Sequence, residues 1–271
     1  MPELPEVETI RRALARELLN LRLQKLQVFD LKLLQNATER QLQSALVGHR
    51  LDEISRRGKF LILGFGERKL VLHLRMTGWL SLHRSERPRL LMQFGSGKAL
   101  YLEDTRRFAT LYLSTRKGLD QLPALAQLGL EPFQPEYMLK NFSKLLKSEQ
   151  EIKRLLLDQH KIAGLGNIYA CEALFAAKIH PLRRADRLTA REMRRLFEAI
   201  PAILGQAIAE QGTSVDTYRL LRGESGNFQN LLKVYGRERQ PCPHCGSPIK
   251  RIAQGGRSSF FCSSCQPPVV R

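Results

Sequence analysis

The sequence predicts an α+β fold with a β-rich N-terminal part, a helical middle part and a small cysteine-rich part at the C-terminal end. Short runs of alternating apolar and polar residues occupy much of the first 130 residues, which is typical of strands. From residue 136 to residue 210 the apolar residues recur at helical spacing. Two Cys-x-x-Cys pairs follow. We therefore expect a β-sandwich or barrel with a helix or two, then a helical part and a metal-binding ribbon.

The charge of the chain indicates a polyanionic partner. Lys and Arg number 44 against 26 Asp and Glu, which leaves a net charge of +18 over 271 residues. Nucleic acid is the first candidate and an anionic membrane the second. No apolar run reaches the roughly 18 residues of a spanning helix, and the acidic N-terminus is unlike a secretion signal. We expect a cytoplasmic protein without membrane contact, and a monomer, since no heptad or self-complementary stripe is present.

The N-terminal residues predict a helix that begins near residue 5. Pro5 suits the first turn of a helix, and Glu6 and Glu8 suit its positive end. An apolar stripe follows at helical spacing, formed by Val7, Ile10, Leu14 and Leu18.

The residues before this helix also suit catalysis. A small second residue normally allows removal of Met1, which makes the secondary amine of Pro2 the N-terminus. An α-amino group titrates near neutral pH, so a fraction of it is an unprotonated nucleophile. Its condensation with a sugar carbon gives an iminium cation, which is an electron sink for elimination. Glu3 stands beside it as a candidate general acid or base. A plain helix start is the alternative interpretation, and both can hold together.

Strands and hairpins account for most of the chain up to residue 130. A strand over 21–28 and a short helix over 38–46, closed by Gly48, come first. In the run 70–76 the even positions are apolar, so the periodicity places Met76 in the core and His73 as a satisfied strand histidine. Two hairpins are expected, 60–65 with 70–76 and 90–94 with 99–103.

The helical part follows a stretch rich in proline. Residues 123–135 contain three prolines and one glycine, which is typical of a linker. The last predicted helix opens with a capping box formed by Thr189 and Glu192 and carries Pro201 as a kink. The predicted helices cover 136–147, 151–159, 168–178 and 189–210.

A glycine-rich turn separates two of these helices. In Gly164-Leu165-Gly166-Asn167 the glycines allow close approach of a backbone, and the amides that open the next helix form an anion site. A phosphate could dock there, with Asn167 as the helix cap or as a direct donor. A plain packing corner is the alternative. A dinucleotide-binding motif is excluded because no strand precedes the turn.

Two further loops are basic. The segment 55–59 stands at the entry to a hairpin, where it is either a solvated loop or a phosphate contact. The run 104–108 combines two arginines with Phe108, a set that can fill a gap in a base stack, although a surface loop with one packed ring is the commoner case.

Four cysteines predict a zinc site. Cys242-x-x-Cys245 and Cys262-x-x-Cys265 are separated by sixteen residues, which is the spacing of a four-thiolate zinc ribbon. Four thiolates leave no open position on the ion, so we expect one structural Zn²⁺. Cys171 lies apart on the inner face of a predicted helix and is expected to pack in the core.

Together these motifs resemble one family, the formamidopyrimidine-DNA glycosylases, bacterial enzymes that excise oxidised purines. The resemblance covers essentially the whole chain. It rests on PELPEVET at 2–9, RRGKF at 56–60, HLRMTG at 73–78, DTRRF at 104–108, LLLDQ at 155–159, AGLGNIYACEALF at 163–175, VYGR at 234–237 and the ribbon ending in Cys265-Gln266.

The resemblance implies an N-terminal β-sandwich, a helix-two-turns-helix domain and a zinc finger, with double-stranded DNA bound between the two halves. The implied segments are a catalytic domain at 1–130, a linker and first helix at 131–150, the DNA-binding helical domain at 151–230 and the zinc finger at 231–271. The implied activity is excision of 8-oxoguanine and formamidopyrimidines from damaged DNA, followed by β,δ-elimination at the abasic site.

The resemblance also implies roles for individual residues. Pro2 would attack the anomeric carbon and form a Schiff base, Glu3 would be the general acid or base, and Lys59 would contact phosphate or lesion. Asn167 and Arg257 would grip phosphates beside the flipped nucleotide. The space that it leaves in the duplex would be filled by Met76, Arg106 and Phe108, which moves Met76 from the core to the surface.

Some positions depart from the family pattern. The family usually has proline where Thr105 stands and glycine where Ala109 stands, so the loop around Phe108 is expected to differ in shape. The segment 218–228 falls where the family has a lesion-capping loop, and no base contact is assigned to it.

Two other functions fit part of the pattern. An endonuclease VIII-type glycosylase for oxidised pyrimidines shares the architecture, but Leu4 and the intact run of Arg106, Arg107 and Phe108 favour the purine-specific branch. A non-enzymatic zinc-ribbon DNA-binding protein fits the charge and the cysteines equally well, but it has no use for a free Pro2 beside Glu3.

Overall fold

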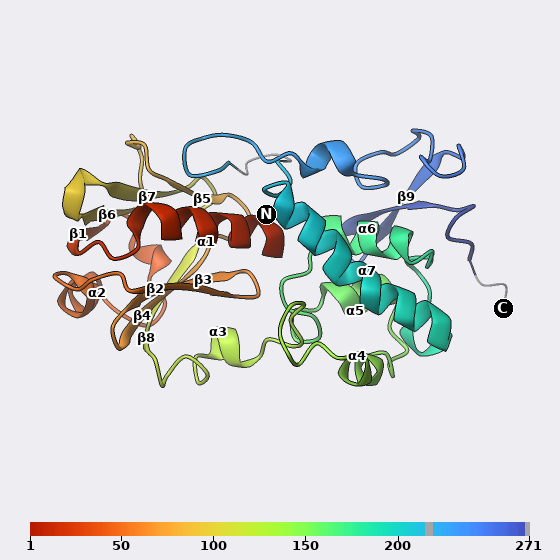
Figure 1. The fold of residues 1–271 in the computed structure, drawn as a ribbon, viewed down its shortest axis with the longest axis horizontal. Coiled ribbons are helices and arrows are strands. Elements are labelled where there is room, and N and C mark those ends of the chain that lie inside the picture. The colour runs from red at the N-terminus through yellow and green to blue at the C-terminus, as the bar shows by residue number, and fades with distance from the viewer. Residues whose placement is uncertain (215–218, 269–271) are drawn as a thin grey trace. The chain divides into compact units, whose positions relative to one another are not determined.

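The computed structural model describes residues 1–214 and 219–268, which form two compact units (Figure 1). The first unit contains Met1–Ala126 and Glu210–Gln229, and the second contains Gln127–Ala209 and Asn230–Arg271. The four segment bounds expected from the sequence stay a prediction. Among the described residues, no helix has both the length and the apolar character that crossing a membrane requires.

The first unit is built on two four-stranded antiparallel sheets, with strand orders β1-β6-β7-β5 and β2-β3-β4-β8. One continuous core contains buried residues from both sheets, which confirms the expected β-sandwich. The strands are β1 (Leu23–Val28), β2 (Glu53–Arg57), β3 (Phe60–Phe65), β4 (Arg68–His73), β5 (Gly78–Ser81), β6 (Leu90–Phe94), β7 (Ala99–Asp104) and β8 (Thr110–Thr115).

Both predicted hairpins form, β3 with β4 and β6 with β7. The periodicity argument for Met76 is wrong, because β4 ends at His73 and Met76 lies beyond it with 42% of its surface exposed. Arg75 has a left-handed backbone (φ 56°), so alternation no longer predicts which way the next side chain points.

Helix α1 (Leu4–Leu18) packs against β2, and its predicted stripe is buried. The buried side of the helix also carries an acidic residue, Glu8, which forms ion pairs with Arg11 and Arg12 at 2.8 Å and with Arg56 of β2 at 3.4 Å. The short helix α2 (Glu39–Leu46) ends before Gly48 (φ 84°), as expected, and Thr38, which was expected to be its first residue, is its N-cap.

The second unit contains the predicted helices, each somewhat shorter than expected, and a two-stranded ribbon. The Thr189 hydroxyl accepts from the Glu192 N–H at 3.3 Å, and the Glu192 carboxylate accepts from the Thr189 N–H at 2.8 Å, which confirms the capping box. The elements are α4 (Leu139–Leu145), α5 (Ile152–Leu157), α6 (Asn167–Ala176), α7 (Ala190–Ala209), β9 (Ile249–Gln254) and β10 (Arg257–Cys262).

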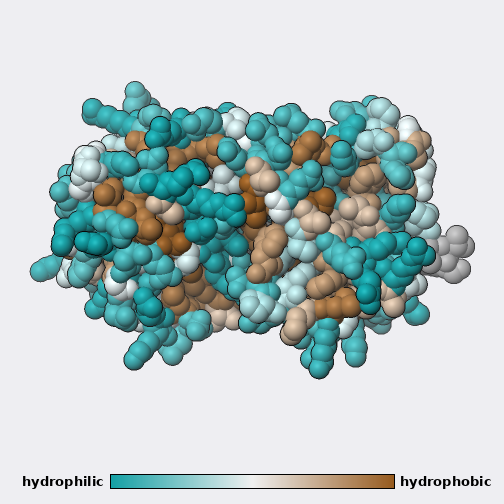
Figure 2. Space-filling view, viewed as in Figure 1, coloured by the Kyte–Doolittle hydropathy of each residue, from teal (hydrophilic) through white to brown (hydrophobic). Residues whose placement is uncertain are grey.

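The expected linker is partly ordered by packing. Pro123–Ala126 forms the short helix α3, which belongs to the first unit. In the second unit Leu130 pairs with Ile162, and a Cβ on Gly129 would lie 2.4 Å from the carbonyl oxygen of His160. Glycine is therefore required at this close approach. Figure 2 shows one face of the protein, on which hydrophilic residues cover most of the surface between apolar patches.

The Glu8 cluster predicts a pH-dependent contribution to stability. Burial alone would raise the pKa of Glu8, but hydrogen bonds from Arg11 and Arg12 and the charges of Arg11 and Arg56 lower it to about 2. A lowered folded-state pKa stabilises the protein above the unfolded value of 4.5, and this contribution is lost as the pH falls towards 2.

We expect Glu8→Gln to lower the free energy of unfolding by about 2 kcal/mol at pH 7, after screening is allowed for, and by less at pH 3. Urea denaturation at both pH values measures this difference. The matched control is Glu198→Gln on the exposed side of α7, which should change little at either pH. An equal loss for Glu8→Gln at both pH values would contradict the explanation.

Candidate active site and zinc site

Two buried glutamates fix the chain at the N-terminus. Glu3 is the N-cap of α1, and its carboxylate accepts from the Glu6 N–H while Glu6 Oε2 accepts from the Glu3 N–H at 2.8 Å. The other carboxylate oxygen of Glu6, Oε1, accepts from the Thr213 N–H, also at 2.8 Å. Pro2 is buried directly before this cap. The nucleophile candidate and the acid–base candidate are thus both held by the first turn of α1.

Sequence reasoning missed the role of Glu6. The spacing Glu3-x-x-Glu6 is that of a capping box, but with glutamate at the N-cap position where serine or threonine is usual. The long-range contact to Thr213 has no local signal in the sequence.

Lys59 is buried, with only 5% of its surface exposed, between β2 and β3. Gly58 before it has φ 56°, so the chain turns there in the left-handed region. Strand β2 is tied to α1 by Arg11 Nη1, which donates to the Ile54 carbonyl at 3.3 Å, and by the pair between Arg56 and Glu8. The burial of Lys59 argues against the solvated loop, which was one of the two interpretations of the segment 55–59.

His73 confirms its expected role as a satisfied strand histidine. Its Nδ1 accepts from the Arg75 N–H at 2.9 Å, and its ring meets that of Phe60 edge-on at 4.5 Å. Burial, together with the charges of Arg75 and Lys59, lowers the pKa of His73 to about 3. The ring is therefore neutral at physiological pH and adds no charge beside Lys59.

The loop between β7 and β8 exposes an arginine–phenylalanine pair. The Arg106 guanidinium lies 4.7 Å from the centre of the Phe108 ring, and 48% of Phe108 is exposed. The Asp104 carboxylate accepts from the N–H groups of Phe108 and Ala109, each at 2.7 Å. Asp104 is a further residue that sequence reasoning missed.

The Met76 loop is joined to this pair. The Thr77 hydroxyl donates to the Asp104 carboxylate and accepts from the Arg106 N–H at 3.2 Å. The structure therefore brings the three predicted void-filling residues, Met76, Arg106 and Phe108, onto two loops that share one buried carboxylate.

In the second unit, Asn167 and Arg257 belong to neighbouring segments. Asn167 Nδ2 donates to the carbonyl of Ser258 at 3.1 Å, and Arg257 is the exposed residue before Ser258, at the start of β10. Asn167 is not the helix cap that the sequence suggested as one possibility. Gly166 is the N-cap and Asn167 is the first residue of α6.

Another buried carboxylate, that of Glu172, holds the start of the VYGR segment. Glu172 of α6 accepts from the N–H groups of Lys233, Val234 and Tyr235 at 2.9 to 3.0 Å. Burial raises the pKa of Glu172, and the three amides oppose that rise. Cys171, beside it in α6, is buried in a small core, as expected.

The four predicted zinc ligands converge. The Sγ atoms of Cys242, Cys245, Cys262 and Cys265 all lie within 4.8 Å of one another. The Cys242–Cys265 and Cys245–Cys262 Sγ separations are 3.9 and 3.5 Å, close to the roughly 3.8 Å edge of a tetrahedron with zinc–sulfur bonds of about 2.3 Å. The residues therefore fit one structural Zn²⁺ ion, which would cross-link the turns on either side of the β9–β10 ribbon.

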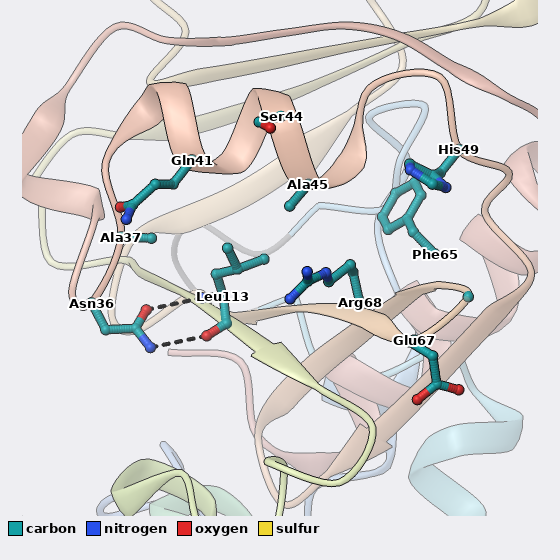
Figure 3. Close-up of a pocket in the computed structure, with 11 residues that line it drawn as sticks. Asn36, Ala37, Gln41, Ser44, Ala45, His49, Phe65, Glu67, Arg68 and Leu113 are labelled. Atoms are coloured by element: carbon teal, nitrogen blue, oxygen red, sulfur yellow. Dashed lines mark hydrogen bonds between the residues drawn. The ribbon is translucent and has the colours of Figure 1, made fainter.

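An open pocket of about 730 Å³ lies in the first unit but contains no predicted site residue. In Figure 3, Gln41, Ser44 and Ala45 border it from α2, and Arg68 borders it from the other side. Asn36 makes two hydrogen bonds of 2.9 Å to the backbone of Leu113, so its amide pairs with the edge of β8 in place of a further strand. No catalytic group is assigned to this pocket.

Three family descriptions match the chain in succession. They are the formamidopyrimidine-DNA glycosylase N-terminal domain over residues 1–111, the H2TH domain of the same enzymes over 128–219, and a zinc finger found in FPG and IleRS over 239–268. The class that they define is a DNA glycosylase with a helix-two-turns-helix domain and a zinc finger.

Named relatives match this chain along nearly its whole length. The formamidopyrimidine-DNA glycosylase of Desulforamulus reducens is 42% identical, with 98% of this chain and 99% of the relative covered. The crystal structure of the MutM (Fpg) protein from Thermus thermophilus is 40% identical, with a TM-score of 0.90 and 98% of both chains covered. The Lactococcus lactis Fpg in complex with abasic-site DNA is 36% identical, with a TM-score of 0.91 and coverage of 98% and 100%. This chain belongs to the formamidopyrimidine-DNA glycosylase family.

The zinc site makes a direct prediction for metal content. We expect the purified full-length protein to contain one zinc per chain, and Cys262→Ala to lose it, because three thiolates hold the ion less tightly and the ribbon depends on it. Elemental analysis after gel filtration measures this. Cys171→Ala, which removes a buried thiol outside the site, should keep the zinc. Full zinc content in Cys262→Ala would contradict the assignment.

Proposed function

We propose that this protein is a base-excision repair DNA glycosylase that removes oxidised purines and then cleaves the abasic strand. Family membership over the whole chain supports the glycosylase activity. The observation that carries the catalytic assignment is the buried Pro2 held before the reciprocal cap of Glu3 and Glu6. Damaged double-stranded DNA is the partner, and the net charge of +18 suits its phosphates. The protein acts as a monomer in the cytoplasm, where bacterial DNA lies.

With Met1 removed, the Pro2 nitrogen attacks C1′ of the damaged nucleotide. A carbon–nitrogen bond forms to Pro2, the glycosidic bond breaks, and the base leaves with its electron pair and is protonated. Opening of the sugar ring then gives the iminium ion. Its positive charge stabilises the carbanion at C2′, so the 3′ phosphate leaves by β-elimination and the 5′ phosphate by δ-elimination.

Glu3 is placed to move the protons. Its carboxylate is buried at the first turn of α1, one residue from the nucleophile, and it serves as the general acid or base for sugar opening and elimination. Lys59, buried beside the same helix and strand, places a positive charge near the reacting phosphate or lesion.

The remaining site residues bind and deform the DNA. A base in the stack is out of reach, so the nucleotide is extruded, which costs a few kcal/mol. Met76, Arg106 and Phe108 fill the space that it leaves, as their exposure and shared carboxylate support. Asn167 and Arg257, linked through Ser258, grip the neighbouring phosphates.

The catalytic assignment predicts the effect of Glu3→Gln. Loss of the general acid–base group should lower the single-turnover rate of 8-oxoguanine excision opposite cytosine by about a hundredfold or more. A gel assay of strand cleavage after alkali measures excision. Zinc content and DNA affinity should be unchanged, which separates a catalytic loss from misfolding.

The competing functions give different results in the same assay. An endonuclease VIII-type enzyme would act faster on a duplex with an oxidised pyrimidine than on the 8-oxoguanine duplex. A non-enzymatic binding protein would release no base from either duplex, and Pro2→Gly would change nothing. We expect faster release of the purine and loss of activity in Pro2→Gly.

The phosphate-binding assignment predicts the effect of Asn167→Ala. The dissociation constant for duplex DNA should rise by about tenfold for damaged and undamaged sequences alike, because a phosphate contact carries no sequence information. Fluorescence anisotropy at fixed salt measures it. Asn141→Ala is the control, because this half-buried amide on α4 donates to the nearby Glu136 carbonyl, at 3.0 Å, and has no proposed phosphate contact. A loss confined to damaged DNA would contradict the assignment.

A further inference from the structure

The two consecutive arginines of the β7–β8 loop have different partners. Arg106 lies over the Phe108 ring, whereas Arg107 binds the carboxylate of Asp30 through two guanidinium nitrogens. Arg107 Nε donates to Asp30 Oδ2 at 2.7 Å, and its Nη2 donates to Oδ1 at 2.6 Å. Such a bidentate pair fixes direction as well as distance.

The backbone of Arg107 explains why a fixed direction matters. Its φ is +58°, in the left-handed region that is uncommon for a residue with a side chain. The Arg107 side chain is bound to Asp30, while the side chains on either side of it, Arg106 and the exposed Phe108, stack on each other. The geometry of the exposed pair therefore depends on the residue between them.

The sheet topology brings Asp30 to this loop from a distant part of the sequence. Strands β1, β6 and β7 are neighbours in one antiparallel sheet, and Val28 pairs with Leu90 and Leu90 with Leu102, so the end of β1, the start of β6 and the end of β7 lie at the same end of the sheet. Arg89, just before β6, joins them. Its Nε donates to the Asp104 carbonyl at 3.1 Å, its Nη1 lies 3.6 Å from Asp30 Oδ2, and its carbonyl accepts from the Phe29 N–H at 2.9 Å.

Asp30 is equipped to hold this arrangement. It is buried, with 4% of its surface exposed, and its Oδ1 also accepts from the Lys32 N–H at 3.2 Å. The hydrogen bond from Arg107 keeps the pKa of Asp30 below its usual value, although burial opposes this, so the carboxylate is ionised at neutral pH. Asp30 is the buried member of this pair, with 3% of its side chain exposed, whereas 44% of the Arg107 side chain is exposed.

We infer that Asp30 is a positioning residue for the void-filling pair: by binding Arg107 it sets the direction in which Arg106 and Phe108 project. This inference rests on the proposed role of that pair in extruding the damaged nucleotide. Asp30 itself touches neither the nucleotide nor Pro2 in this mechanism. Its effect should therefore be confined to the step in which a base leaves the stack.

The test is Asp30→Asn in the full-length protein, which keeps the size of the side chain and removes its charge. Two single-turnover rates are measured: excision of 8-oxoguanine from a paired duplex, and cleavage of the same duplex with a preformed abasic site. The second substrate has no base to extrude. We expect excision to fall by about tenfold, equivalent to about 1.4 kcal/mol, and abasic cleavage to change by less than about twofold.

The ratio of the two rates is the decisive quantity, because a simple loss of folded protein lowers both rates equally. The matched control is Asp186→Asn. Asp186 forms the same kind of fork with Arg184, at 3.1 and 2.7 Å, on a turn of the second unit. That variant should leave the ratio unchanged. An unchanged ratio in Asp30→Asn would overturn the inference.

Phe108→Ala separates this inference from the proposed function on which it rests. If Phe108→Ala lowers the ratio and Asp30→Asn does not, void filling stands and the role of Asp30 is wrong. If Phe108→Ala also leaves the ratio unchanged while base release continues, the void-filling assignment is wrong and the Asp30 inference falls with it.

A second variant breaks the same ion pair at its exposed member, Arg107. Arg107→Gln should lower the ratio as Asp30→Asn does, and it carries the test if the latter does not fold. The double variant should lose no more than the larger single effect, because both substitutions break one interaction. Additive losses would show that the two residues act independently and would overturn the inference.

Discussion

Buried carboxylates that accept backbone N–H groups fix the functional segments of this protein, and the pair at the N-terminus matters most. Glu3 and Glu6 cap α1 reciprocally, and Glu6 also binds the Thr213 amide from a distant part of the first unit. A chain end is ordinarily mobile unless it is tied down. Here the cap and the buried stripe of α1 tie it down, so that Pro2 is presented in one place. Without this constraint, a secondary amine at the N-terminus would have no fixed geometry for attack.

The same device recurs at the other candidate sites. Asp104 accepts amides of the loop that carries Arg106 and Phe108, and Glu172 accepts three amides of the 233–235 segment. The protein has 26 acidic residues against 44 basic ones, and these carboxylates are buried against the backbone. Exposed arginine and lysine are thereby left to face phosphates, while the carboxylates organise the backbone beneath them.

The sequence predicted the architecture well because the local signals agree with the fold. The runs of alternating residues form the predicted hairpins, and the apolar stripe of α1 is buried. The four cysteines with zinc-ribbon spacing lie in one cluster. It failed for Met76 because β4 ends three residues earlier, at His73, and Arg75 beyond the strand has a left-handed backbone, which periodicity does not encode. Resemblance to the family moved Met76 to the surface, and the structure agrees. The roles of Glu6, Asp104 and Asp30 were missed because each depends on contacts that only the folded chain creates. The assigned roles of the site residues stay proposals.

The central claim is that the N-terminal proline is the nucleophile. The most direct measurement is borohydride reduction during reaction of the full-length protein, with Met1 removed, on a duplex carrying 8-oxoguanine opposite cytosine. Reduction turns an iminium into a stable covalent bond. Peptide mapping of the trapped adduct should place the sugar remnant on the nitrogen of Pro2. An adduct on Lys59 or another lysine, or base release with no adduct at all, would contradict the account.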